Sequence, residues 1–224
     1  MNKANSVIFL AEIIGTFGLV VSATGSIVYD DSVGGILCVG FIATMHFVGI
    51  SFMIFLFGRY SMAHFNPAVT VAFFFAGYIC IKKIPMYFGA QIIGAFLGSF
   101  FVKYVLGDFA KLGLNLPNYE YPAGLFFSVE ALATLFLMGS ILVAINIKGL
   151  SSIFVSTIIA GTVALDVYFF GSISGASMNP IRSLTPSLLT GILDDLWLYW
   201  TAPFIGGVVP AFIFKLMKNR KLVK

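Results

Sequence analysis

Long runs of apolar residues alternate with short polar stretches along this chain of 224 residues. A bilayer-spanning helix needs roughly 20 consecutive apolar residues, and six runs approach or exceed that length. They are the segments 7–28, 34–57, 84–106, 122–146, 152–171 and 196–217. Two further apolar segments, 66–77 and 179–190, are too short to cross a bilayer. The pattern predicts an all-α membrane protein with six transmembrane helices and two short helices.

The composition agrees with a chain whose surroundings are largely lipid. Hydrophobic residues make up 59% of the chain and charged residues 10%, which is more apolar surface than a soluble core can hide. The first run, from Val7 to Val28, is long enough to span and lacks a small-residue cleavage site, so we interpret it as a helix and not a signal peptide. Cys38 and Cys80 lie in or beside apolar stretches, which favours membrane burial over a disulfide.

Basic residues are distributed unevenly between the two sets of connections. If the N-terminus is cytoplasmic, only Lys103, Lys111 and Arg182 lie on the outer side. An excess of Lys and Arg marks cytoplasmic loops, so we expect an integral protein of the plasma membrane with both termini in the cytoplasm. The charges form no single soluble patch, and no nucleic-acid partner is expected. The inner residues are Lys3, Arg59, Lys82, Lys83, Lys148, Lys215, Lys218, Arg220, Lys221 and Lys224.

The two halves of the chain, about 1–110 and 120–224, repeat each other within a single transmembrane domain covering 1–224. The segment that ends at Glu12 resembles the one that ends at Glu130, and an Asn-Pro pair occurs once in each half. Three spans per half is an odd number, so the second copy enters the membrane upside down. Such an inverted repeat places its functional site near the membrane midplane.

Each short segment opens with an Asn-Pro turn, Asn66-Pro67-Ala68 in the first half and Asn179-Pro180-Ile181 in the second. Asparagine is a strong helix N-cap, and proline suits the first helical position. Two re-entrant half-helices starting here from opposite faces would bring their N-termini together at the bilayer centre. Non-helical backbone at that depth needs protein or water around it. The turns therefore predict a water-filled path whose helix dipoles hinder cations.

These turns carry a specific resemblance. Asn66-Pro67-Ala68-Val69-Thr70 and the segment from Gly175 to Ser183 are similar to the paired signature loops of the aquaporin, or major intrinsic protein, family. The resemblance covers almost the whole chain. It implies a six-helix pore with two half-helices in each protomer of a homotetramer, passing water and small neutral solutes such as ammonia, urea or hydrogen peroxide and excluding protons and ions.

The resemblance also implies roles for individual side chains. Glu12 and Glu130 lie inside predicted spans, where a charge costs at least ~2.5 kcal/mol without compensation. In aquaporin-like folds the equivalent glutamates, together with a histidine such as His64, support the pore loops. The family's selectivity filter, counted from the Asn-Pro turns, falls on His46, Val167, Ala176 and Arg182. This combination is similar to filters of some plant vacuolar aquaporins, which as a class can admit urea or ammonia.

Several alternatives remain open at this stage. His46 could be an ordinary buried histidine, with Phe47 facing the pore. Ser183 and the pair Tyr199-Trp200 favour water over glycerol, yet a glycerol-type facilitator is the alternative within the family. A proton-coupled secondary transporter would use Glu12, Glu130 or Asp166.

Two residues depart from the family pattern, and one acid is unexpected. Ile181 replaces the usual alanine after Asn179-Pro180, and Met62 stands where glycine is usual. Added bulk at Ile181 raises the alternative of a non-conducting protein with a blocked pore. Asp166 lies inside the fifth span, where it could pair with His46, Arg182 or a loop amide.

Catalytic chemistry is not indicated by any motif in the chain. The sequence contains no phosphate-binding glycine loop, no metal-spaced His or Cys cluster, and no pairing of a nucleophile with a base. We therefore expect neither an enzyme nor a cofactor or metal site.

Overall fold

The computed structural model describes residues 3–219 and is helical throughout its regular elements. Six helical spans are long and apolar enough to cross a membrane. The charges predicted at Arg220, Lys221 and Lys224 lie outside the described residues. The long helices are α1 (Lys3–Ser32), α2 (Cys38–Ser61), α4 (Ile84–Leu106), α6 (Ala123–Asn146), α7 (Ser152–Ser174) and α10 (Ala202–Asn219); the short ones are α3 (Pro67–Phe75), η1 (Ile81–Lys83), α5 (Phe109–Gly113), α8 (Pro180–Thr190) and α9 (Leu196–Tyr199).

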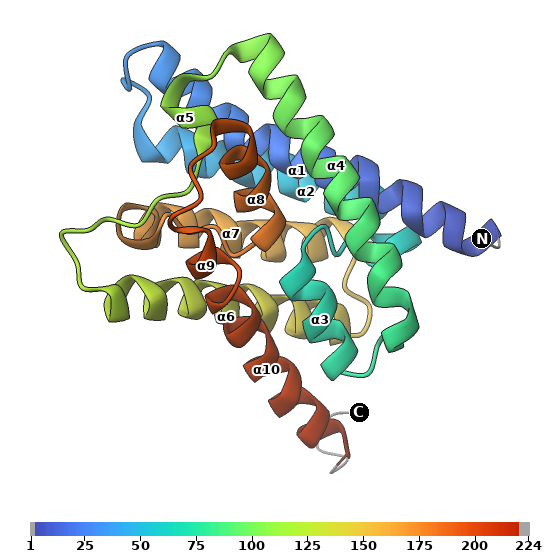
Figure 1. Cartoon of the computed structure of the whole chain (residues 1–224). Coiled ribbons are helices and arrows are strands. Elements are labelled where there is room, and N and C mark those ends of the chain that lie inside the picture. The colour runs from blue at the N-terminus through green and yellow to red at the C-terminus, as the bar shows by residue number, and fades with distance from the viewer. Residues whose placement is uncertain (1–2, 220–224) are drawn as a thin grey trace.

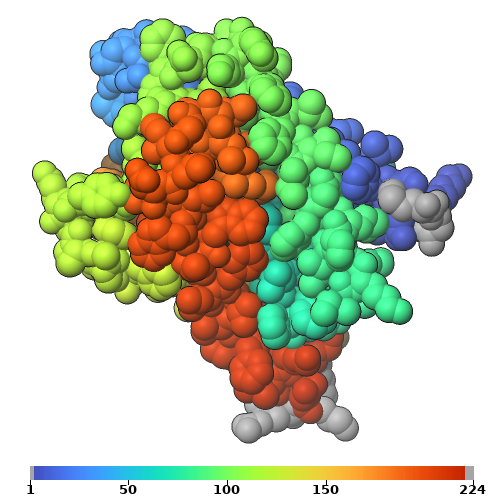
Figure 2. Space-filling view, in the orientation of Figure 1, coloured from blue at the N-terminus to red at the C-terminus, as the bar shows by residue number. Residues whose placement is uncertain are grey.

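The long helices pack as two similar groups, which also contact each other through the short helices α3 and α8. In the first group α1 packs against α2 and α4, in the second α6 packs against α7 and α10, and α2 contacts α7 between them. In Figure 1 the beginning of α1 lies at the right, α10 runs to the bottom, and α5 lies at the upper left. Figure 2 shows α8, in orange, lying against α4, in green. In this packing α3 contacts α10 and α4, and α8 contacts α4 and α3.

Two glycines let the long helices approach closely at matching places in the two groups. A Cβ atom at Gly94 would lie 2.3 Å from the backbone oxygen of Ile13, and one at Gly206 would lie 2.0 Å from that of Ala131. Small residues at helix crossings are how membrane helices gain close van der Waals packing. The α1–α4 and α6–α10 crossings therefore depend on glycine.

The predicted spans are confirmed as helices, with two differences at their ends. The second run was expected at 34–57, but α2 starts at Cys38 because Gly34 and Gly35 take positive φ angles of 89° and 73°. The Asp30 carboxylate also accepts a hydrogen bond from the Leu37 amide at 2.8 Å, which fixes this connection. The sixth run, expected as continuous from 196 to 217, is interrupted after α9 and resumes in α10.

Local sequence explains why α3 and α8 stay short. The α3 helix ends before Gly77, whose φ is +81°, and the Tyr78 amide bonds back to the Phe73 carbonyl at 2.9 Å. The α8 helix ends at Gly191, with φ of +76°. Glycine adopts this left-handed conformation without a steric penalty and so terminates helices.

Candidate functional site

The two Asn-Pro turns meet and hold each other through reciprocal hydrogen bonds. The Asn66 side-chain amide donates to the Met178 carbonyl at 2.8 Å, and the Asn179 amide donates to the Phe65 carbonyl at 2.9 Å. Each asparagine oxygen also caps its own helix by accepting a backbone amide two residues later, at 2.8 Å and 3.2 Å. An amide nitrogen carries two hydrogens. One hydrogen on each asparagine therefore remains for another acceptor.

The segments leading into these turns have a strained backbone in both halves. Left-handed residues other than glycine cost roughly 1–2 kcal/mol each, so both loops need support from outside. The non-glycine residues with positive φ are Met62 (65°), Ala63 (50°) and Phe65 (50°) in the first loop, and Ala176 (41°) and Met178 (53°) in the second.

Glu12 supplies that support to the first loop from α1. Its side chain is fully buried, and its two carboxylate oxygens accept four hydrogen bonds. Acceptance from the loop backbone satisfies donors that would otherwise be unpaired in an apolar interior. The donors are Ser61 Oγ at 2.6 Å, the His64 amide at 3.0 Å, the Phe65 amide at 2.8 Å and Gln91 Nε2 at 2.9 Å.

Glu130 holds the second loop from α6 in the same manner. Ser174 Oγ and the amides of Ser177 and Met178 donate to its carboxylate at 2.8, 3.2 and 2.6 Å. Pro203 takes the place in the repeat that Gln91 takes in the first half. Glu130 therefore accepts three hydrogen bonds where Glu12 accepts four.

His64 braces the first half-helix. Its Nδ1 lies 3.0 Å from Thr70 Oγ1, and the Thr70 hydroxyl donates to the Asn66 carbonyl at 3.0 Å. Because the hydroxyl hydrogen is already used, Nδ1 of His64 must be the donor. The ring also stacks between Phe73 and Tyr87, with centroid distances of 4.5 and 4.2 Å.

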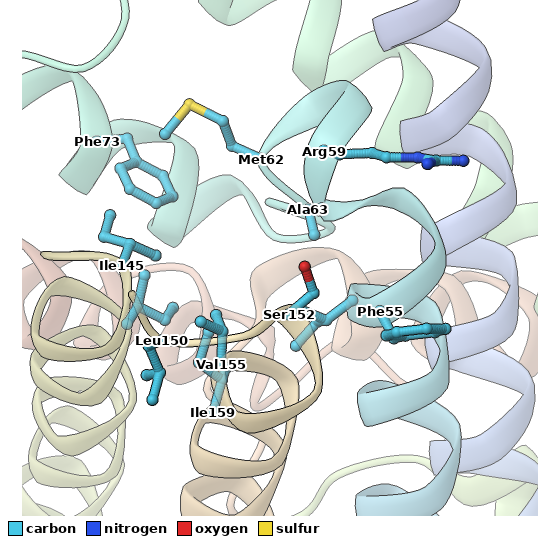
Figure 3. Close-up of a pocket in the computed structure, with 13 residues that line it drawn as sticks. Phe55, Arg59, Met62, Ala63, Phe73, Ile145, Leu150, Ser152, Val155 and Ile159 are labelled. Atoms are coloured by element: carbon cyan, nitrogen blue, oxygen red, sulfur yellow. The ribbon is translucent and has the colours of Figure 1, made fainter. Parts of the chain in front are cut away.

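Three cavities lie in line through the bundle. We name them by the orientation expected from the distribution of Lys and Arg: the inner one, of about 340 Å³, is drawn in Figure 3, the central one is about 40 Å³ and the outer one about 240 Å³. His46 and Arg182 line both the central and the outer cavity. Successive turns of α2, α6 and α7 line the inner cavity and then the central one: Ile54, Ile141 and Ile159, followed by Ile50, Leu137 and Val163.

The central cavity is the narrow point, and both asparagines line it. A cavity of about 40 Å³ holds a few water molecules at most, since one water needs roughly 10–15 Å³ measured this way. Apart from Asn66, Asn179, Ser177, His46 and Arg182, its lining side chains are apolar. Polar contacts for anything inside are therefore confined to few positions.

The sequence-predicted filter residues gather between the central and outer cavities, with one exception. Val167 lines the outer cavity beside His46 and Arg182. Ala176 is buried and not among the lining residues, whereas its neighbour Gly175 is. Phe47 lies instead in a groove between α2 and α7, so His46 and not Phe47 faces the cavities.

The ring of His46 is fixed by its own helix. Nδ1 lies 2.8 Å from the Ile42 carbonyl, and a carbonyl can only accept, so Nδ1 carries a hydrogen. When the ring is neutral, Nε2 is left as an acceptor. His46 is thus both a buried histidine satisfied by a neighbour and a cavity-lining side chain.

Arg182 is held by a loop that the sequence did not single out. Its Nη1 donates to the Gly113 carbonyl at 2.8 Å and to the side-chain oxygen of Asn115. Asn115 also accepts from Ser183 Oγ at 2.9 Å and donates to the Gly175 carbonyl at 2.7 Å. Because these partners are neutral, they orient the guanidinium without cancelling its charge.

A left-handed helical turn presents this loop to Arg182. Ala110, Lys111 and Leu112 have φ of 47°, 52° and 58°, and Gly113 follows with φ of 65°. Gly113 also lies so close to α1 that a Cβ atom would be 2.8 Å from the Thr24 carbonyl oxygen. Leu112 is buried against Val28 and Val102. Three successive non-glycine residues in this conformation make the turn the most strained run of backbone described.

The residues that depart from the family pattern do not fill the central cavity. The Ile181 side chain is fully buried in a cluster with Val20 and Ala95, between α8, α1 and α4. Met62 lines the inner cavity near Phe73, as Figure 3 shows. The bulk at Ile181 is therefore absorbed by packing behind the half-helix.

We expect Ile181→Ala to destabilise the protein without increasing water flux. Removing a fully buried isoleucine side chain leaves a cavity and costs about 2–5 kcal/mol. Thermal unfolding in detergent measures the loss, and osmotic shrinkage of proteoliposomes measures flux per reconstituted protein. Higher flux in Ile181→Ala than in the parent would instead mean that Ile181 obstructs the pore.

Asp166 makes none of the hydrogen-bonded pairings that the sequence left open for it. Its side chain is buried on α7, and Oδ2 lacks a hydrogen-bond partner among residues 3–219. The considered pairing with His46, Arg182 or a loop amide is thus not present. No role in the cavities follows from its position.

Comparison with known proteins places this architecture among membrane channels. The sequence model described as Major intrinsic protein matches residues 2–214, so the chain belongs to the major intrinsic protein family, the aquaporin channels, which are not enzymes. Aquaporin NIP3-1 of Arabidopsis thaliana is 34% identical over 218 residues, covering 95% of this chain and 68% of that protein. Aquaporin NIP1-2 of Oryza sativa subsp. japonica is 33% identical, covering 97% and 73%.

A solved structure confirms the fold. The aquaglyceroporin from Plasmodium falciparum superimposes with a TM-score of 0.83 over 97% of each chain, at 23% identity. At that identity the likeness establishes the aquaporin fold alone. The prediction of six spanning helices with short helices between them is thereby confirmed.

Proposed function

We propose that this channel passes water passively, admits small neutral solutes such as ammonia, urea and hydrogen peroxide, and excludes protons and ions. The observation that carries the proposal is the line of three cavities, narrowest where the Asn66 and Asn179 amides meet. The apolar lining offers a passing molecule few sites at which to bind tightly. Conduction requires binding weak enough for the molecule to leave.

The asparagine pair accounts for the exclusion of protons. Each amide has one hydrogen left after its bond across the pore, and both can donate to the same water oxygen. That water then points its own hydrogens away from the centre on both sides, which interrupts a proton-conducting chain. The N-termini of α3 and α8 add positive dipole ends at the same point.

Arg182 is proposed to select solutes at the outer end. Both hydrogens of Nη1 are used on Gly113 and Asn115, which leaves Nη2 and Nε to donate into the cavities. A fixed positive charge repels cations, and the neutral solutes exchange water contacts for hydrogen bonds to the guanidinium. His46 and Val167 complete the proposed filter, and Gly175 lines the cavity beside them where Ala176 was expected.

We also propose that the protein is a homotetramer in the plasma membrane, with lipid around each protomer and both termini in the cytoplasm. The support is family membership together with the excess of Lys and Arg on one side of the chain's connections. Because the cavities lie within one chain, each protomer contains its own pore.

Osmotic shrinkage of proteoliposomes, followed by stopped-flow light scattering, tests the proposal. We expect shrinkage much faster than in empty vesicles, with a low activation energy and no response to an imposed pH gradient. A proton-coupled transporter would respond to that gradient. Shrinkage no faster than in empty vesicles would exclude a water channel, and glycerol entry as fast as urea entry would favour a glycerol-type facilitator.

A further inference from the structure

The proposed filter depends on a loop whose strained backbone has to be held in place. Both hydrogen-bond acceptors of Arg182 Nη1 lie in residues 113–115, at the end of the left-handed turn. Isolated from its surroundings, a turn of three non-glycine left-handed residues would relax to other conformations. Whatever fixes the turn therefore fixes the arginine.

One side chain outside the loop bonds the start of this turn. The Asp31 carboxylate, in the last turn of α1, accepts a hydrogen bond from the Ala110 amide at 2.7 Å. Ala110 is the first residue of the left-handed run.

The other end of the turn is anchored on the same helix. Gly113 packs against the backbone of Thr24, two turns before Asp31 on α1, and Leu112 packs against Val28. The turn is thus bonded at its start and packed at its end along one face of α1. Among residues 3–219, Asp31 is the only side chain that accepts a hydrogen bond from a backbone amide of this turn.

We propose that Asp31 is a positioning residue of the filter: it holds the left-handed turn that presents the Gly113 carbonyl and the Asn115 side chain to Arg182. The inference rests on the proposed role of Arg182. Asp31 itself is exposed and lines none of the three cavities. Its loss lets the arginine reorient, which widens the filter toward larger neutral solutes.

The neighbouring acids provide matched controls. Asp108 is exposed in the same loop, two residues before Ala110, and makes no side-chain cap bond to it. Asp108→Ala therefore removes the same charge from the same region and leaves the turn bonded. Asp31→Asn keeps an oxygen that can accept the Ala110 hydrogen and removes only the charge.

The test compares urea and water permeability in proteoliposomes, as a ratio, for equal amounts of reconstituted full-length protein. We expect Asp31→Ala to raise the urea-to-water ratio by about two- to tenfold, the range by which losing one hydrogen bond shifts a local equilibrium. Asp31→Asn and Asp108→Ala should match the parent. An unchanged ratio in Asp31→Ala, or an equal rise in Asp31→Asn or Asp108→Ala, would overturn the inference.

A double variant separates positioning from general loss of structure. If Asp31 acts through Arg182, adding Asp31→Ala to Arg182→Ala should not raise the ratio further, because interacting residues are not additive. An additive rise would mean that Asp31 acts elsewhere. Should Asp31→Ala reconstitute poorly, Asp31→Leu removes the same acceptor with a side chain of similar shape and must raise the ratio too.

The same measurements distinguish this inference from the proposed function. A urea-to-water ratio that changes in Arg182→Ala but not in Asp31→Ala contradicts only the proposed role of Asp31. A urea-to-water ratio that stays unchanged in Arg182→Ala contradicts the assignment of Arg182 to the filter, and therefore also the positioning role of Asp31.

Discussion

Glu130→Gln is expected to leave almost no conducting protein. The carboxylate accepts three hydrogen bonds from the second loop, and the glutamine amide nitrogen would face at least one of these donors with hydrogens of its own. Each buried donor left unpaired costs about 1–3 kcal/mol, against a total stability of about 5–15 kcal/mol. Water flux per reconstituted protein and the thermal unfolding temperature should both fall.

Asp166→Asn is the matched control for that variant. It also neutralises a buried acid inside a span, but Oδ2 of Asp166 has no hydrogen-bond partner among the described residues. We expect parental flux and stability from it. Glu12→Gln should be at least as damaging as Glu130→Gln because Glu12 accepts four bonds. Parental behaviour of Glu130→Gln would show that the second loop does not need its carboxylate.

Arg182→Ala is expected to conduct water as the parent does but to discriminate less well against cations and urea. A unit charge about 4 Å from a passing cation raises its energy by about 4 kcal/mol at an effective dielectric constant of 20. Part of the barrier remains, because the dipoles of α3 and α8 and the asparagine pair are unchanged. We therefore expect proton and sodium leak to rise by at least about tenfold, since such a rise requires the loss of only part of that energy. Urea entry should rise as well.

A pH-sensitive dye trapped inside proteoliposomes measures the proton leak after an imposed gradient. Arg182→Lys is the control, since it keeps the charge but has one nitrogen, so that bonds to Gly113 and Asn115 leave no second nitrogen to donate into the cavities. It should keep most of the cation barrier and lose part of the urea discrimination. Proton leak in Arg182→Ala at the level of the parent would place the barrier entirely at the asparagines.

The sequence alone was sufficient to predict features whose chemistry is local, or whose energetic penalty would be large without compensation. Asn66-Pro67 and Asn179-Pro180 identify helix starts because capping involves residues within one turn. Glu12 stood out because a charge inside a span must be compensated. Its actual donors, among them Ser61 and Gln91, lie 49 and 79 residues away, and only the packing of α1 on α2 and α4 identifies them.

The outer loop could not be predicted for a different reason. Asn115 lies between the two halves, so no repeated partner draws attention to it, and its bonds to Arg182 and Gly175 span 67 and 60 residues. The left-handed turn is hidden as well, because Ala110, Lys111 and Leu112 are residue types that rarely adopt positive φ. The sequence pattern predicts too early a start for α2 because Gly34 and Gly35 continue its apolar run.

The reciprocal bonds between the asparagine turns also set an order on biosynthesis. The acceptor of Asn66 lies 112 residues further along the chain, and ribosomes add about 5–20 residues per second, so this wait lasts roughly 6 to 22 seconds. During that time the Asn66 amide and the Phe65 carbonyl lack their final partners, and unpaired polar groups are costly in lipid. The first half-helix must therefore stay near water or the insertion machinery until α8 arrives, and the pore is completed in one late step.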